Sequence, residues 1–168
     1  MNYNTLFLDR DGILNRKIDN GYVLKPEELE IMPGIKDFLY WANKKFLQIL
    51  VVTNQRCIGR KLLREEDLWS IHQGLNEQTG NFIDDFLFCP HLEEDQCACR
   101  KPGEGLFLKA AANYAVDFSR SWMIGDSISD LIPAKKLGMK TIYVGSVGNE
   151  YADFTLNTTS DIYNVFIP

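Results

Sequence analysis

Three aspartates stand where short apolar segments of the chain end, and carboxylates placed in this way can bind a metal. Asp9 and Asp11 belong to FLDRDG, and Asp126 belongs to IGDSISD. Residues two apart on an extended chain point to the same side, so Asp9 and Asp11 can face one space. Two neighbouring carboxylates repel each other unless a cation or a shared proton compensates. A lone Asp-x-Asp would indicate a turn or a helix cap, but together with Asp126 it predicts an oxygen-rich Mg²⁺ site with positions left for water and a phosphate oxygen.

Groups that can bind phosphate follow two other apolar segments. Thr53 offers a hydroxyl and Asn54 an amide in VVTNQ, although TNQ alone would also suit an ordinary turn. Lys101 adds an ammonium group, which neutralises phosphate as a point charge. Carboxylates, a hydroxyl and an ammonium are the groups that phosphoryl transfer requires.

Three of the four cysteines and one of the two histidines fall close together in the segment 89–99. Their spacing, C-x-H-x₅-C-x-C, is typical of a closed tetrahedral zinc site that supports folding. Disulfides are the rival interpretation, but a reducing compartment disfavours them, and cysteines two positions apart pair with difficulty. The predicted Zn²⁺ ligands are Cys89, His91, Cys97 and Cys99.

A zinc-bound loop over 89–99 would hold the chain at the mouth of the predicted site. It would also fix the direction in which Arg100 and Lys101 leave the last cysteine, which explains why the cluster and the basic pair adjoin. Cys57 is interpreted as a plain loop or buried thiol, and His72 as a packing or surface residue.

Alternating strands and helices are expected to carry these motifs. Apolar runs rich in β-branched or aromatic residues predict strands near 5–8, 47–52, 85–88, 121–124, 141–144 and 154–156. Amphipathic segments predict a helix that begins at Pro33-Gly34 and others near 64–78, 105–115, 129–137 and 161–166. This order implies a doubly wound, three-layer α/β fold with a parallel, Rossmann-like sheet and a ligand site beyond the carboxyl ends of the strands.

Length and composition set the class of protein. A chain of 168 residues with 45% hydrophobic content is expected to form one domain over 1–168. No secretory signal and no apolar run of about 18 residues is visible, so we expect a cytoplasmic protein. The net charge of −5 argues against broad binding of nucleic acid. We expect a monomer that binds a small phosphorylated substrate, without nucleic-acid or membrane partners.

FLDRDGILN, VVTNQ, CRKP and IGDSISD, in this order, resemble the four signature motifs of the haloacid dehalogenase-like phosphatases. The resemblance covers most of the chain between residues 6 and 145. The segments 12–48 and 56–88 are too short for the inserted cap domain of other branches. The zinc loop narrows the resemblance to the branch that contains the D-glycero-D-manno-heptose 1,7-bisphosphate 7-phosphatases and the histidinol-phosphate phosphatases.

The resemblance implies a role for each motif residue. Asp9 would be the nucleophile that forms an aspartyl phosphate, and Asp11 the general acid and then the base, in agreement with the chemistry of a paired carboxylate. Thr53 and Lys101 would hold the transferring phosphate. The residues implied to hold Mg²⁺ or its waters are Asp9, the main-chain carbonyl of Asp11, Asp126 and, as a supporting residue, Asp130.

The substrate is suggested by loop sequences. DNGYVLKPEELEIMPGI and VVTNQRCIGR resemble the heptose enzymes, whereas the short loop in CPHLEEDQCACRKP is typical of the histidinol-phosphate enzymes and also occurs among the heptose enzymes. Heptose bisphosphate is favoured, and histidinol phosphate, another small phosphomonoester and a nucleic acid 3′-phosphate stay open. The residues implied to contact substrate are Asp19, Asn20, Gly21, Tyr22, Thr53, Asn54, Gln55, Arg56, Arg100 and Lys101.

The chain departs from the heptose enzymes at three places. Arg56-Cys57 replaces the usual Ser-Gly, Ile13 replaces a common Thr, and KPGEG lacks the usual second proline. We hypothesise that Arg56 clamps a second phosphate. A different class of function, an inactive zinc-stabilised interaction module, is disfavoured because the five residues that would do the chemistry are all present.

Overall fold

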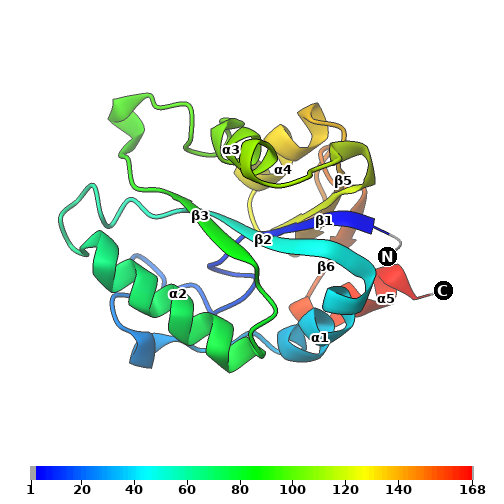
Figure 1. Ribbon diagram of the computed structural model, residues 1–168, viewed down its shortest axis with the longest axis horizontal. Helices are drawn as coiled ribbons and strands as arrows, with labels where there is room; N and C mark the ends of the chain where they lie inside the picture. The colour runs from blue at the N-terminus through cyan, green and yellow to red at the C-terminus, as the bar shows by residue number, and fades with distance from the viewer. Residues whose placement is uncertain (1–2, 168) are drawn as a thin grey trace.

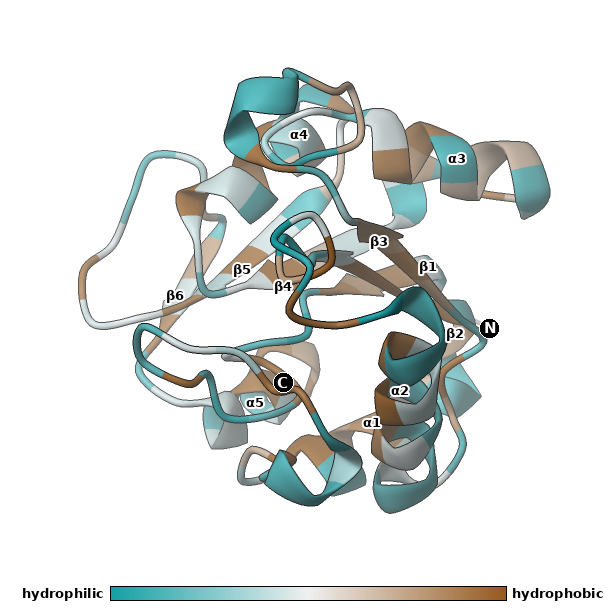
Figure 2. Ribbon diagram, turned by 90° about the vertical axis from the view of Figure 1, so that its left-hand side faces the viewer, coloured by the Kyte–Doolittle hydropathy of each residue, from teal (hydrophilic) through white to brown (hydrophobic). Residues whose placement is uncertain are grey.

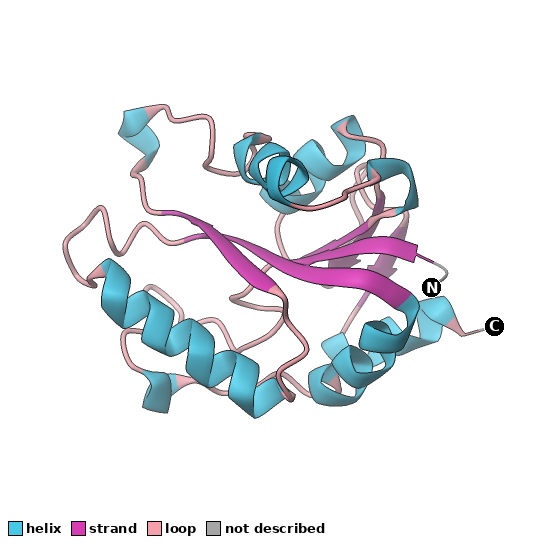
Figure 3. Ribbon diagram, viewed as in Figure 1, coloured by secondary structure: helices cyan, strands magenta, loops and turns pink. Residues whose placement is uncertain are grey.

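The computed structural model describes residues 3–167, which form a six-stranded sheet flanked by helices (Figures 1 and 3). All neighbouring strands pair in parallel, in the order β3-β2-β1-β4-β5-β6. Parallel pairing requires crossover connections, and the helices supply them. The strands are β1 (Tyr3–Leu8), β2 (Phe46–Asn54), β3 (Asp85–Cys89), β4 (Trp122–Gly125), β5 (Lys140–Val144) and β6 (Phe154–Leu156).

The helices form a layer on each face of the sheet. One face is covered by α1 (Ile35–Lys45), α2 (Glu65–Thr79) and α5 (Ile162–Phe166), and the other by α3 (Gly105–Asn113) and α4 (Ile128–Lys136) (Figure 1). Short 3₁₀ turns are η1 (Pro26–Glu28), η2 (Glu93–Asp95), η3 (Phe118–Arg120) and η4 (Thr159–Asp161). In the described part of the chain, no helix has both the length and the apolar character needed to cross a membrane. The three-layer fold predicted from the sequence is confirmed.

The central strand β1 explains why its sequence is apolar on both sides. Leu6, Phe7 and Leu8 have no exposed surface. Leu6 and Leu8 belong to the cluster beneath α1 and α5, whereas Phe7 belongs to the opposite cluster and packs edge-on against Phe107 of α3 at 5.2 Å between ring centroids. Successive side chains of a strand point to opposite faces, so a strand covered on both faces must be apolar throughout.

Local signals define where the elements begin and end. Gly34 and Gly80 adopt left-handed backbone at the start of α1 and the end of α2, with φ of 78° and 102°. Ser127 and Asp130 form a capping box at the start of α4. The Asp130 carboxylate accepts a hydrogen bond from the Ser127 backbone N–H, and the Ser127 hydroxyl accepts from backbone N–H groups of the first helical turn. The observed elements agree with the predicted ones to within a few residues. The single domain over 1–168 stays a prediction.

The order of the strands creates a natural site. The chain moves outward in one direction from β1 through β2 to β3, and in the other direction from β4 to β6. A crevice forms at such a switch point, at the carboxyl ends of the strands. Figure 2 looks toward this edge and shows apolar strands surrounded by polar loops. FLDRDG follows β1 and GDSISD follows β4 at this switch point, while TNQ stands at the end of the neighbouring β2.

Candidate active site

A cavity of about 550 Å³ lies at the carboxyl ends of β1, β2 and β4. Its volume is in the usual range for a small-molecule site. Asp19 is exposed and does not line it, so the structure does not bring this predicted residue to the site. The predicted residues that line it are Asp9, Asp11, Asn20, Gly21, Tyr22, Thr53, Asn54, Gln55, Arg56, Arg100, Lys101, Asp126 and Asp130.

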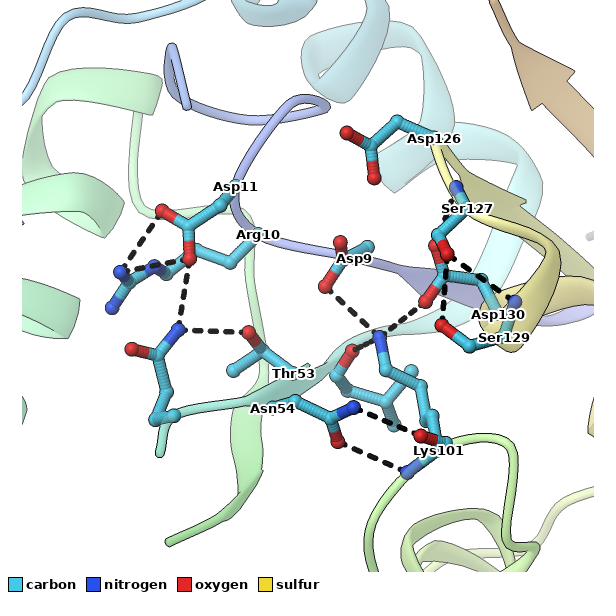
Figure 4. A network of polar contacts seen from close by, with 12 residues as sticks. Asp9, Arg10, Asp11, Thr53, Asn54, Lys101, Asp126, Ser127, Ser129 and Asp130 are labelled. Carbon is cyan, nitrogen blue, oxygen red and sulfur yellow. Dashed lines mark hydrogen bonds and ion pairs between the residues drawn. The ribbon is translucent and has the colours of Figure 1, made fainter. Parts of the chain in front are cut away.

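Lys101 lies between two carboxylates at the bottom of the cavity (Figure 4). Its Nζ is 2.9 Å from Asp9 Oδ1 and 2.6 Å from Asp130 Oδ1, and it donates to the carbonyl of Val52 at 2.6 Å. Burial alone would lower the pKa of Lys101, but the carboxylates of Asp130 and Asp9 outweigh burial and raise this pKa well above its ordinary value. Lys101 is therefore a permanent buried cation.

Burial raises the pKa of Asp9 to about 6, and repulsion from Asp130 adds to the increase although Lys101 opposes it. Burial likewise raises the pKa of Asp126 and of Asp130. The Oδ1 of Asp126 is buried without a hydrogen-bond partner, and its Oδ2 meets Lys17 Nζ at 3.3 Å. The two ammonium groups, Lys101 and the more exposed Lys17, are fewer than the three crowded carboxylates, so the cluster carries net negative charge.

The same carboxylates fit a divalent cation. Oxygens of Asp9, Asp126 and Asp130 all lie within 4.8 Å of one another. Hard cations such as Mg²⁺ prefer oxygen ligands and need only one or two carboxylates when water and phosphate complete the shell. A cation here would give the unpartnered Asp126 oxygen a partner and would oppose the rise in the pKa values of Asp9 and Asp126.

The side chain of Asp11 turns away from Asp126 (Figure 4). Arg10 Nη2 lies 2.9 Å from both of its oxygens, and Asn15 and Gln55 donate amide N–H groups at 3.0 and 2.9 Å. Burial would raise the pKa of Asp11, but Arg10 and these hydrogen bonds lower it below the ordinary value. The structure therefore holds Asp11 ionised and separate from the carboxylates that cluster around Lys101.

The end of β2 holds Lys101 in position as well as lining the cavity. Gln55 Nε2 donates to the Thr53 hydroxyl at 2.9 Å. Asn54 accepts from the backbone N–H of Lys101 through Oδ1 and donates to its carbonyl through Nδ2, both at 3.0 Å. Asn54 was expected to bind phosphate, whereas here its side chain positions the backbone of Lys101.

Two glycines leave the space that the carboxylates occupy. Gly12 has φ of 96°, and a Cβ there would overlap the carboxylate of Asp126. A Cβ on Gly125 would overlap the side chain of Asp130. The backbone after β1 therefore packs directly against Asp126 of the segment after β4, and the end of β4 packs against Asp130 of the helix that follows it.

The predicted zinc ligands converge beside this cavity. Their Sγ and ring nitrogen atoms all lie within 4.8 Å of one another. Sulfur–sulfur separations are 3.1 to 3.5 Å, and His91 Nδ1 is 3.2 Å from Cys99 Sγ. Disulfide sulfurs would be about 2.05 Å apart, whereas Zn–S bonds of about 2.3 Å place tetrahedral sulfurs roughly 3.7 Å apart. The four groups are Cys89, His91, Cys97 and Cys99.

The loop after β2 supports this cluster. The backbone N–H of Gln55 donates to the Cys89 carbonyl at 2.8 Å, and that of Gly59 donates to the Pro90 carbonyl at 3.0 Å. Cys57 is fully buried in this loop and His72 is buried in α2, stacked on Phe86 at 4.4 Å between ring centroids. Neither side chain lines the cavity.

A second group of charges lines the cavity near the Cys/His cluster. Arg56 and Arg100 both reach Glu93 Oε1, from Nη1 at 3.2 Å and Nη2 at 3.0 Å. Arg56 also donates through Nε to the Tyr22 hydroxyl at 2.9 Å. Glu93 lies in η2, in the loop between Cys89 and Cys97 of the cluster.

Sequence reasoning missed the roles of Arg10, Glu93 and Lys17. Arg10 carried only its position between two site aspartates, and alternation along an extended chain would point its side chain away from theirs. Glu93 carried only its position within the zinc loop, and Lys17 only its distance of a few residues from FLDRDG. The contacts of these three residues depend on loop conformations, which the alternation of apolar and polar residues does not predict.

Comparisons with known proteins give consistent similarities. Residues 98–158 match the family model described as HAD-hydrolase-like. The chain is 33% identical to the D-glycero-beta-D-manno-heptose-1,7-bisphosphate 7-phosphatase of Haemophilus ducreyi, over 96% of the chain and 97% of that relative. It is 41% identical to the enzyme of the same name from Helicobacter pylori, over 79% of the chain and 78% of that relative.

A solved structure is also similar over nearly the whole length. It is the D,D-heptose 1,7-bisphosphate phosphatase from B. bronchiseptica complexed with magnesium and phosphate, with a TM-score of 0.86. The two sequences are 25% identical, and the match covers 98% of each chain. The match therefore spans the segments of this chain that form the sheet, the strand ends and the Cys/His loop.

Proposed function

Because the chain belongs to the heptose 1,7-bisphosphate 7-phosphatases, a family of haloacid dehalogenase-like hydrolases, we propose that it removes the 7-phosphate of D-glycero-D-manno-heptose 1,7-bisphosphate. One observation carries the proposal. Asp9 lies directly after β1, 2.9 Å from the buried ammonium of Lys101 and beside the carboxylates of Asp126 and Asp130, which together with it could hold a metal ion. A carboxylate nucleophile needs this combination of nearby positive charge and little solvent.

In the first step an oxygen of Asp9 bonds to the phosphorus of the 7-phosphate, and the bond from phosphorus to the sugar oxygen breaks. A proton from the Asp11 carboxyl goes to the leaving sugar oxygen. Donors from Arg10, Asn15 and Gln55 favour the ionised form of Asp11 in the free protein. Asp11 must therefore turn from these donors to act as an acid.

In the second step Asp11 takes a proton from water, whose oxygen attacks the phosphorus of the aspartyl phosphate. The bond from phosphorus to Asp9 breaks, and inorganic phosphate leaves. Lys101 and the Thr53 hydroxyl bind oxygens of the phosphate throughout, which stabilises the charge of the transition state. The ionised resting form of Asp11 suits this second step.

The metal ligands that we propose are Asp9, the main-chain carbonyl of Asp11, and Asp126, with Asp130 in support. When bound, Mg²⁺ supplies positive charge to these carboxylates and to the phosphate. The B. bronchiseptica structure complexed with magnesium and phosphate supports the choice of metal. Asp130 keeps Lys101 and the start of α4 in place through its contacts with Lys101 Nζ and the Ser127 N–H.

We also propose a structural zinc ion in the Cys/His cluster. The convergence of three sulfurs and one imidazole nitrogen within 4.8 Å supports it. A closed set of four protein ligands leaves no position for substrate, so its role would be to order the loop. This loop leads directly into Arg100 and Lys101.

The test measures phosphate release with Mg²⁺ from heptose 1,7-bisphosphate and from histidinol phosphate. We expect kcat/KM to be at least about 100-fold higher for the heptose, which is ~2.7 kcal/mol of transition-state binding. A preference for histidinol phosphate would overturn the choice of substrate. No release from either would overturn the proposed function, provided that the protein is folded and holds its metals.

A further inference from the structure

The charges that line the cavity are not all used by the proposed chemistry. Four of its five acids, Asp9, Asp11, Asp126 and Asp130, follow β1 and β4, and the fifth is Glu93. Lys101 serves the reacting phosphate, but Arg56, Arg60 and Arg100 also line the cavity. Three guanidinium groups around one cavity exceed what a single phosphate needs.

Arg56 and Arg100 point at a single oxygen atom, Glu93 Oε1, from 3.2 and 3.0 Å. They come from different segments, one after β2 and the other after the Cys/His cluster. Tyr22 fixes Arg56 by accepting a hydrogen bond from Nε at 2.9 Å, and Arg60 lies over the Tyr22 ring at 5.9 Å. The two guanidinium groups therefore converge on a point where an anion's oxygen already sits.

Glu93 is well suited to leave this point. Its side chain is 67% exposed, whereas those of Arg56 and Arg100 are 40% and 18% exposed. Ion pairs of an exposed carboxylate are weak, so moving Glu93 outward costs little. Arg56 is also held by the Tyr22 hydroxyl and Arg100 is mostly buried, whereas the Glu93 carboxylate has the two arginines as its side-chain partners in the described part of the chain.

Arg100 also keeps an unused donor. Its Nη1 is buried without a hydrogen-bond partner, and a buried donor left unpaired is unfavourable. A phosphate has more acceptor oxygens than a carboxylate, and guanidinium groups bind phosphate in a bidentate manner. A phosphate at this point would satisfy both guanidinium groups better than Glu93 does.

We propose that Glu93 occupies the site of the substrate's second phosphate in the free protein, and that Arg56 and Arg100 bind this phosphate after Glu93 moves out. The identity of the ligand rests on the proposed function, because the heptose bisphosphate carries a phosphate at each end. Arg56 and Glu93 thereby determine specificity for a bisphosphate over a monophosphate. Neither side chain touches the reacting phosphate.

The test compares heptose 1,7-bisphosphate with heptose 7-phosphate, which lacks only the second phosphate. Arg56→Met should reduce kcat/KM for the bisphosphate about tenfold more than for the monophosphate, which is ~1.4 kcal/mol. Glu93→Gln should lower KM for the bisphosphate severalfold and raise the ratio of the two kcat/KM values. Arg64→Met and Glu94→Gln are matched controls, because Arg64 pairs with Asp67 and neither residue 64 nor residue 94 lines the cavity.

The inference is wrong if Arg56→Met loses equal kcat/KM on both substrates, or if Glu93→Gln behaves like Glu94→Gln. In that case phosphate release by the native protein would still support the proposed function. To test the anion site separately from the proposed function, binding of both sugars to Asp9→Asn protein is measured by calorimetry, with and without Arg56→Met. If the native protein releases no phosphate but Arg56→Met still weakens binding of the bisphosphate selectively, the proposed function is wrong and the anion site stands. If Arg56→Met does not change the affinity for the bisphosphate, the proposed anion site is wrong.

Discussion

The two ends of the cavity are built in different ways. At the inner end, Lys101 and Asp130 are 2% and 1% exposed, and they are held by strand ends and by the cap of α4. At the outer end, Arg56 and Glu93 are 40% and 67% exposed and belong to loops. The inner end has one geometry enforced by the sheet, whereas the outer end can rearrange. The two proposals thus assign reaction chemistry to the inner end and substrate choice to the outer end of one cavity.

Lys101 joins the two ends. Its ammonium belongs to the inner end, while its backbone follows the Cys/His cluster and forms two hydrogen bonds with Asn54. The loop and the sheet therefore position the same residue. Changes on each side should separate their contributions.

The largest effect is expected at the inner end, from Asp9→Asn. Loss of the nucleophile should reduce phosphate release by about 10⁴-fold or more, which is ~5.4 kcal/mol. Far-UV circular dichroism should keep its native form, because the amide has the shape of the carboxylate, and the zinc content should be unchanged, because the outer end is untouched. Asp19→Asn is the matched control, since Asp19 is exposed outside the cavity. Activity above one hundredth of the native rate in Asp9→Asn would assign the nucleophile elsewhere.

Lys101→Met should give the largest loss of stability. It leaves the buried carboxylates of Asp9 and Asp130 without their shared cation, at a cost of about 3–5 kcal/mol. The variant's carboxyl pKa values then lie even further above their unfolded values, so its stability should recover as the pH is lowered from 7 to 5. Urea unfolding at both pH values measures this.

Lys109→Met, in the exposed part of α3, is the control for that experiment. It should lose little stability at either pH. A loss in Lys101→Met that does not shrink at pH 5 would contradict the account of buried carboxylate repulsion.

Zinc removal should have a smaller effect, because it acts on the outer end. A chelator, or Cys97→Ser, is expected to lower kcat/KM about 10- to 100-fold, since a displacement of about 1 Å in a catalytic group can cost this much. Far-UV circular dichroism should keep its native form, because Asn54 still ties Lys101 to β2. Elemental analysis should show one zinc per chain in the native protein and in Cys57→Ala, and none in Cys97→Ser. Global unfolding on chelation would show that the two ends are not independent.

The smallest effect concerns His72, which is buried in α2. Burial lowers its pKa to about 3, and the nearby charge of Arg10 adds to this. Below about pH 6.5 His72 is protonated in the unfolded chain but stays neutral in the folded one. The free energy of unfolding therefore keeps the full His72 contribution above this pH and falls by about 1.4 kcal/mol per pH unit below it. His72→Leu should flatten the pH dependence of unfolding between pH 6.5 and 5. An unchanged slope would place the acid sensitivity in other groups.

Particular residues show how far the sequence could predict this structure. Leu6, Phe7 and Leu8 had to form a central parallel strand because they are consecutive and apolar. Asp9 and Asp126 could then be brought together, since the carboxyl ends of neighbouring parallel strands share one edge. The convergence of Cys89, His91, Cys97 and Cys99 could be predicted because their types and spacing restrict the geometry of a short loop, while zinc itself stays a proposal.

The sequence could not predict contacts that depend on loop conformation. Asn54 lines the cavity as predicted, but its side chain also binds the backbone of Lys101, and predicting this requires knowing where the chain returns after the Cys/His loop. Asp19 lies outside the cavity although its neighbours Asn20 to Tyr22 line it. Glu93 gained its role from two arginines that lie far from each other in sequence.

Gly12 and Gly125 make the site sensitive to substitution at positions that carry no reactive group. A side chain at either position would occupy the volume of Asp126 or Asp130. In a random mutagenesis screen scored by colour from released phosphate, both glycines should appear among the inactive clones as often as the aspartates do. A distant relative that keeps every acid but carries alanine at either position should therefore be classed with the non-catalytic members of its lineage.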